Sequence, residues 1–128
     1  MSQTSPQKRG QHGEEAAARF LQRNGYTLVE RNWRVGNALR GEIDCIARHG
    51  KTLCFVEVKT RASNEHGAPQ EAVTRGKQRQ LSRLANAYVS QHDIEAPCRF
   101  DVVEVWLADD ASIPRIALHP NAFDYCGF

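Results

Sequence analysis

The residues best suited to chemistry in this sequence are two acids and a lysine, Asp44, Glu57 and Lys59. Two apolar runs flank Gly50-Lys51, which predicts a β-hairpin with a type II′ turn, because glycine accepts the positive φ of the first turn position. In that register Asp44 faces Glu57, and Lys59 lies two residues further along the same side of the ribbon. A three-residue loop with a bulge would break this parity.

Two carboxylates and a lysine on one side of a sheet predict a site for a hard divalent cation, Mg²⁺ or Mn²⁺, which prefers oxygen ligands. Asp44 and Glu57 would supply ligands, with the carbonyl of Val58 as a third and Glu14 binding directly or through water. Lys59 would orient a water molecule or offset charge on a phosphate. The set therefore suits phosphodiester hydrolysis. The alternative is a cross-strand ion pair between Lys59 and either acid, worth roughly 0.2–1 kcal/mol.

The first helix must bring Glu14 to the hairpin. A helix is predicted over residues 13–24, because Ala17, Phe20 and Leu21 recur at helical spacing. Glu14 lies three residues before Ala17 and seven before Leu21, which places it on the inward stripe of this helix. The alternative is that Glu14 is only a first-turn acid that complements the helix dipole.

The remaining elements read as strands and one long helix. We expect strands at residues 27–33, 99–107 and 113–119, loops at 35–40 and 60–69, and a helix over 69–91 that is broken near Thr74. Pro114 and Pro120 set the limits of the last strand. The order predicts an α/β or α+β fold with a mixed sheet covered by helices.

Basic residues are concentrated in the second helix. Arg75, Arg79 and Arg83 recur every four residues, away from the apolar stripe, whereas Lys77 and Gln78 extend that stripe toward the sheet. An arginine stripe is either a solvated face or a phosphate-binding surface. The nucleic-acid contacts we assign are Arg31, Arg34, Arg61, Arg75, Lys77, Arg79 and Arg83. His66, in the loop after Lys59, has no second histidine at a metal-ligand spacing.

Composition fits one soluble domain. The chain has 128 residues, 41% hydrophobic and 25% charged, with a formal net charge of +2, and we expect a disordered arm at 1–11 followed by one domain at 12–128. No apolar run approaches membrane-spanning length and no export signal is evident. The four cysteines form no Cys-x-x-Cys pair. We therefore expect reduced thiols, no zinc finger and a cytoplasmic location.

Several motifs, in order, resemble those of the YraN family of bacterial proteins. They are Gly10-x-x-Gly13-Glu14-x-x-Ala17, Arg31-Asn32-Trp33-Arg34, Gly41-Glu42-Ile43-Asp44, Phe55-Val56-Glu57-Val58-Lys59-Thr60-Arg61, Ala72-Val73 and Cys98-Arg99-Phe100-Asp101-Val102-Val103. The resemblance runs from Gly10 to Phe123.

The resemblance implies a restriction-endonuclease-like three-layer fold of the PD-(D/E)xK nuclease superfamily, with a mixed sheet of about five strands, similar to archaeal Holliday-junction resolvases. It maps the strand acid to Asp44, the Glu-x-Lys to Glu57 and Lys59, and the helix acid to Glu14. Isoleucine stands at position 43 where the superfamily has proline.

The leading hypothesis is a Mg²⁺-dependent (or Mn²⁺-dependent) endonuclease acting on DNA, including branched DNA, in repair or recombination. The alternatives are a nucleic-acid-binding module that does not cut and a protein-interaction factor in DNA processing. A resolvase makes two cuts in a four-way junction, so it should form a symmetric homodimer. We expect no membrane partner.

Overall fold

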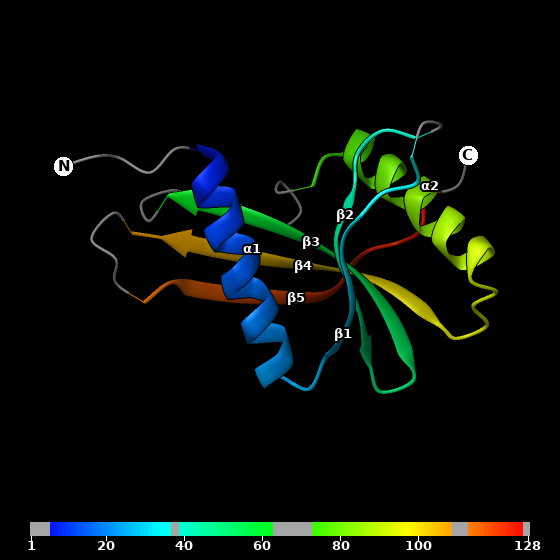
Figure 1. Cartoon of the computed structure of the whole chain (residues 1–128), viewed down its shortest axis with the longest axis horizontal. Helices are drawn as coiled ribbons and strands as arrows, with labels where there is room; N and C mark the ends of the chain where they lie inside the picture. Colours follow the sequence, from blue (N-terminus) through cyan, green and yellow to red (C-terminus); the bar gives the residue numbers. More distant parts are fainter. Residues whose placement is uncertain (1–5, 37–38, 63–72, 109–112, 127–128) are drawn as a thin grey trace.

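In the computed structural model, five strands form one mixed sheet between two helices (Figure 1). The structure describes residues 6–36, 39–62, 73–108 and 113–126. The elements run in the order α1 (Pro6–Arg23), β1 (Thr27–Trp33), β2 (Ile43–His49), β3 (Thr52–Ala62), α2 (Arg75–Gln91), β4 (Cys98–Leu107) and β5 (Arg115–Phe123). This confirms the predicted fold class, a three-layer α/β arrangement.

The strands lie in the order β1-β2-β3-β4-β5. All neighbours pair antiparallel except β3 and β4, which are parallel and joined through α2. A parallel pair needs such a crossover, because its strands cannot be joined by a tight turn. The central strand is therefore β3, the strand that carries Glu57 and Lys59.

Each helix covers one face of the sheet. Leu53 and Phe55 of β3 pack in the core cluster that contains α2, whereas Cys54 and Val56 pack in the cluster that contains α1. Alternate side chains of a strand point to opposite faces, so β3 is buried on both sides over this stretch. Its burial then decreases from Glu57 to Lys59, as expected for a central strand that ends in a site.

The hairpin has the predicted register. Cys45 pairs with Val56 and His49 with Thr52, around a turn in which Gly50 has φ +63°. Lys51 is not among the residues with positive φ, which agrees with a type II′ rather than a type I′ turn.

Helix α1 is longer than predicted. It begins at Pro6, so residues 6–11 of the arm predicted to be disordered are helical; residues 1–5 lie outside the described part. Proline suits the first turn of a helix, because it lacks a backbone N–H and the N–H groups of that turn have no acceptor within the helix. This segment is polar and mostly exposed, and it continues a helix whose buried residues, among them Ala17 and Leu21, lie further along the chain.

Two other boundaries differ from the prediction. Strand β3 continues to Ala62 rather than ending at Lys59. Helix α2 begins after Thr74, where the sequence predicts a break, and the Thr74 hydroxyl accepts a hydrogen bond from the Lys77 amide at 3.2 Å; residues 69–72 lie outside the described part. Strand β5 runs past Pro120 to Phe123. Proline is tolerated there because β5 is an edge strand, and the pairing with β4 shifts register at this point. The loop residue His66 lies outside the described residues.

Candidate metal and phosphate site

The site lies where β2 separates from β3. Pairing of these two strands ends at Cys45–Val56, while β2 continues along β1 to Ile43. The side chain of Asp44 then replaces the missing strand partner, because its Oδ2 accepts a hydrogen bond from the backbone N–H of Val58 at 2.8 Å. In a strand the N–H and C=O of one residue point to the same side, so the Val58 carbonyl also faces this fork.

The carboxyl groups of Asp44 and Glu57 interact directly. The Asp44 carboxyl is hydrogen-bonded to Glu57, and burial followed by this hydrogen bond and the charge of Glu57 raises the pKa of Asp44 to about 9. Two neighbouring carboxylates cannot both ionise cheaply in a poorly hydrated place. Burial and the neighbouring Glu57 therefore favour the protonated form of Asp44 when no cation is bound.

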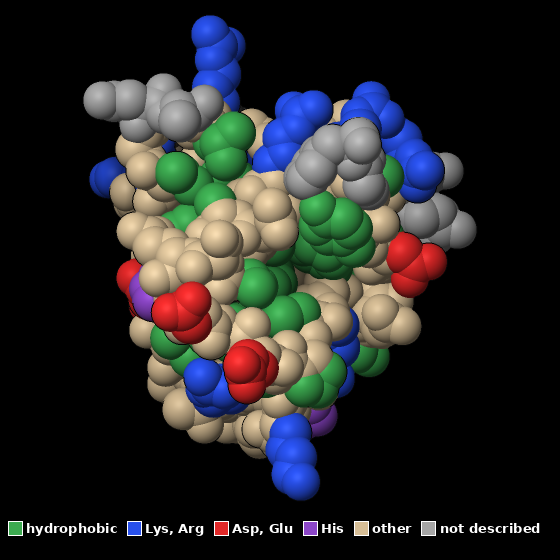
Figure 2. All heavy atoms as spheres, turned by 90° about the vertical axis from the view of Figure 1, so that its right-hand side faces the viewer, with side chains coloured by type: hydrophobic (Ala, Val, Ile, Leu, Met, Phe, Trp, Pro, Cys, Tyr) green, Lys and Arg blue, Asp and Glu red, His purple; other side chains and the backbone are tan. Residues whose placement is uncertain are grey.

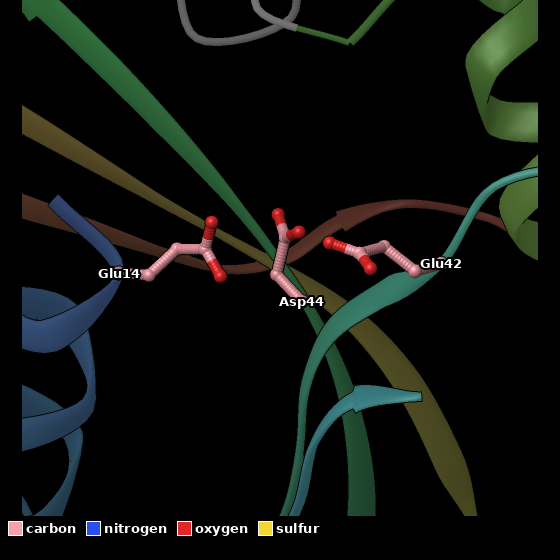
Figure 3. Close-up of side chains that lie close together, drawn as sticks. All are labelled: Glu14, Glu42 and Asp44. Carbon is pink, nitrogen blue, oxygen red and sulfur yellow. The ribbon is translucent and has the colours of Figure 1, made fainter. Parts of the chain in front are cut away.

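Helix α1 brings Glu14 to the same place, as the sequence predicts. Glu14, Glu42 and Asp44 each offer a carboxylate oxygen within 4.8 Å of the others, and Figure 3 shows Glu14 and Glu42 reaching toward Asp44 from opposite sides. Burial raises the pKa of Glu14, and the charges of Asp44 and Glu42 act in the same direction. The half-buried cluster contains only hard oxygen donors, which fits Mg²⁺ or Mn²⁺.

Two glycines let this cluster form. A Cβ at Gly13 would overlap the Thr60 hydroxyl, so glycine allows α1 to approach β3 immediately before Glu14. A Cβ at Gly41 would lie 2.6 Å from the Gln80 amide nitrogen, and the φ of Gly41 is +85°. Each Gly-Glu pair thus combines a close approach of the backbone with a carboxylate aimed at the site.

Asn32 holds the two glutamates together. Its side-chain amide donates hydrogen bonds to Glu14 at 2.7 Å and to Glu42 at 3.0 Å. Its φ is +53°, a left-handed conformation that asparagine adopts more readily than most residues. Sequence reasoning did not assign Asn32 or Glu42 to the site. The position of Glu42, two residues before Asp44, was the one available signal for it.

Lys59 lies on the wall of a cleft beside the acids. The cleft, of about 380 Å³, is lined by Arg9, Gly10, Glu14, Asp44, Val58, Lys59, Thr60, Arg61 and Ala62. The side chain of Lys59 is exposed, and no ion pair joins it to Asp44 or Glu57 among the described residues. The cross-strand ion pair that was the alternative interpretation of this lysine is therefore not formed.

Lys77, rather than Lys59, is the cation next to Glu57. Its ammonium lies 3.5 Å from the Glu57 carboxylate, which is 12% exposed. The prediction that Lys77 points toward the sheet is confirmed, since this contact crosses from α2 to β3. Glu57 thus lies between Asp44 and Lys77. Asp44 lines the cleft, whereas Glu57 and Lys77 do not.

The remaining basic residues lie in different settings. Arg75, Arg79 and Arg83 are exposed on α2, whereas Arg31 pairs with Glu15 at 2.9 Å and Arg34 with Glu42 at 3.0 Å. Arg61 is 9% exposed and its guanidinium lies 2.6 Å from Glu104. The sequence predicts that Arg61 lies in a loop and contacts phosphate. It lies instead within an internal ion pair, because β3 continues through it.

No helix in the described part of the chain is long and apolar enough to cross a membrane, and the four cysteines carry free thiols.

Comparison with known proteins gives a consistent match. The family described as "Uncharacterised protein family UPF0102" matches residues 13–105. A UPF0102 protein of Symbiobacterium thermophilum is 50% identical over 115 residues, covering 89% of this chain and 94% of that protein. One from Geobacter metallireducens is 45% identical over 116 residues, covering 90% and 91%. One from Chlorobium chlorochromatii is 51% identical over 96 residues, covering 75% and 72%.

Proposed function

The chain belongs to the UPF0102 (YraN) family, and we propose that it is a metal-dependent endonuclease that hydrolyses phosphodiester bonds in DNA, including branched DNA. The observation that carries this proposal is the cluster of Glu14, Glu42 and Asp44 at a strand fork, with Glu57 beside Asp44 and an exposed lysine on the adjoining cleft. Carboxylates that hold a cation next to a free ammonium group match the requirements of phosphoryl chemistry.

The acids would hold Mg²⁺ or Mn²⁺ through Asp44, Glu57 and Glu14, with Glu42 and the Val58 carbonyl close by. When bound, the cation would polarise water and offset charge on the phosphate. Asp44 is fixed for this role by its hydrogen bond from Val58. Asn32 fixes Glu14 in the same way. Lys59 would orient the attacking water or neutralise the charge that develops on the phosphate in the transition state.

The surface beside α2 supports a nucleic-acid partner. Helix α2 contains Arg75, Lys77, Arg79 and Arg83 and no acidic residue, and Figure 2 shows basic side chains gathered where this helix begins. A groove of about 660 Å³ at this end is lined by Leu39, Arg40, Thr74, Gly76, Lys77, Gln80 and Arg83. Because Lys77 also contacts Glu57, this groove adjoins the acids. A backbone of phosphates bound there would continue toward the site.

The activity is tested with a cleavage screen over duplex, single-stranded and four-way-junction DNA with Mg²⁺ or Mn²⁺. Asp44→Asn should abolish metal-dependent cleavage, because the amide keeps the bond from Val58 but is a poor metal ligand. Glu14→Gln should reduce cleavage, while Glu15→Gln, the exposed neighbour on the same helix, should leave it unchanged. Undiminished nicking by Asp44→Asn would reject the proposed site.

A second candidate is a nucleic-acid-binding module that does not cut. The contact between Lys77 and Glu57 favours it, because a protein cation already balances one of the acids. DNA binding that weakens with salt, without cleavage of junctions, flaps or forks at any metal concentration, would select this function. For a junction-cutting enzyme we propose a homodimer, and light scattering on the purified protein measures that state directly.

A further inference from the structure

Arg9 occupies a position in the cleft that the sequence did not indicate. It lies four residues before Gly13 and eight before Ala17, on the stripe of α1 that packs against the sheet. Gly13 contacts Thr60 of β3, so Arg9, one helical turn earlier, extends over the part of β3 that follows. Its half-buried side chain lines the cleft together with Lys59.

The basic residues near the site differ in their partners. Arg61 is held by Glu104 at 2.6 Å, Lys77 by Glu57 at 3.5 Å and Arg34 by Glu42 at 3.0 Å. Within the described part of the chain, Arg9 and Lys59 have no such ion pair. A guanidinium that is partly withdrawn from water loses part of its hydration, and here no described carboxylate pairs with it in return. An anion that enters the cleft would supply the missing hydrogen bonds and the opposite charge.

The cleft is lined by groups of both charges. Glu14 and Asp44 supply oxygen ligands, and Arg9 and Lys59 supply positive charge. An arginine presents a planar fork of N–H donors that matches two oxygens of one phosphate, whereas a lysine acts as a point charge. Arg9 can therefore bind two oxygens of one phosphate, whereas Lys59 offers a single positive charge in the same cleft.

We propose that Arg9 binds a backbone phosphate of the nucleic acid through its guanidinium fork and so positions the strand against the acids. This inference rests on the proposed function, because it assigns a phosphate contact to the same cleft. It adds a substrate-positioning residue from the first turns of α1.

The test measures DNA binding separately from cleavage. A fluorescently labelled four-way junction, and a labelled single strand of one of its arms, are titrated with the full chain in buffer that contains Ca²⁺ in place of Mg²⁺. Arg9→Ala should weaken binding by about 10- to 100-fold, and Arg9→Lys should give an intermediate loss because it keeps the charge without the fork. Arg23→Ala, which removes an exposed arginine from the last turn of the same helix, should change binding less than about twofold.

Salt dependence separates a phosphate contact from a structural role. If Arg9 contacts phosphate, Arg9→Ala should lower the slope of log affinity against log salt by about one, while Arg23→Ala leaves the slope unchanged. Thermal unfolding should not distinguish the two variants, since Arg9 makes no ion pair with a described residue.

The outcomes separate this inference from the proposed function. Tight binding by the wild type and by Arg9→Ala alike overturns the role of Arg9 and leaves the nuclease proposal standing. Weakened binding by Arg9→Ala, with no cleavage by the wild type in Mg²⁺ or Mn²⁺, supports the phosphate contact and refutes hydrolysis. Absence of binding by the wild type to either DNA overturns both.

Discussion

Replacing Asp44 with asparagine should make the protein more stable at neutral pH, although the change removes a residue of the candidate site. Burial and the adjacent Glu57 raise the pKa of Asp44 from 3.8 to about 9. Between these values the folded protein holds a proton that the unfolded chain has released. The stability that this proton provides is complete at low pH and is lost progressively as the pH rises toward about 9. An asparagine side chain resembles the protonated carboxyl, because it accepts from Val58 and donates to Glu57 without titrating.

The size of the effect follows from the linkage between protonation and folding. Each pH unit within this window lowers the unfolding free energy of the wild type by about 1.4 kcal/mol. The largest gain that Asp44→Asn could give near neutral pH is therefore roughly 4 kcal/mol. Part of the Asp44 side chain remains in contact with water, so we expect Asp44→Asn to gain about 1–3 kcal/mol in the free energy of unfolding near neutral pH. The gain should become smaller as the pH falls.

The assay is urea unfolding of both proteins, followed by circular dichroism, in buffers that contain a chelator to remove divalent cations. Curves at about pH 5, 6, 7 and 8 give the difference in unfolding free energy as a function of pH. A gain that increases with pH supports a protonated Asp44. A gain that is constant over this range, or a variant that is less stable throughout, would show that Asp44 is ionised in the folded protein and refute the reasoning.

Three further predictions concern the packing of α1, the charge beside Glu57 and a buried hydrogen bond. Gly13→Ala should lower the unfolding free energy by about 1–3 kcal/mol, because its Cβ would overlap a side chain of β3. Gly10→Ala, with no neighbour within 4 Å of the new Cβ, should instead raise the unfolding free energy by about 0.5–1 kcal/mol. Urea unfolding measures both changes. Lys77→Gln should tighten Mn²⁺ binding several-fold, because it removes a competing cation 3.5 Å from Glu57, and unchanged affinity in a calorimetric titration would argue against that competition. Tyr26→Phe should cost about 1–3 kcal/mol of stability, because the buried carboxylate of β4 loses a hydrogen bond of 2.8 Å; a loss below about 0.5 kcal/mol would contradict this.

The hairpin and its side-chain parity could be predicted from the sequence because both depend on local rules. Gly50 fixes the turn, and the alternation of side chains along a strand then decides which residues share a side. Asp44 and Glu57 face each other for this reason. The inward position of Glu14 and the sheet-facing position of Lys77 likewise follow from helical periodicity.

The other members of the site depend on contacts that local rules do not describe. Asn32 joins two glutamates that are distant in the chain, through a backbone conformation that its residue type permits but does not require. Arg9 lies in a polar segment whose helix is stabilised by packing against β3. Arg61 forms an internal ion pair because β3 extends beyond its predicted end. In each case tertiary structure, rather than propensity, decides the position of the side chain.

The strand fork gives the molecule an internal reporter. The backbone N–H of Val58 donates a hydrogen bond to a carboxyl oxygen of Asp44 rather than to the backbone carbonyl of a neighbouring strand. The NMR chemical shift of this amide proton should therefore respond to every change in the charge of that carboxyl. Titration with acid, with a divalent cation or with DNA should move this resonance, while amides within the regular ladder stay nearly still. One backbone signal would thus follow the state of the site before any substrate is known.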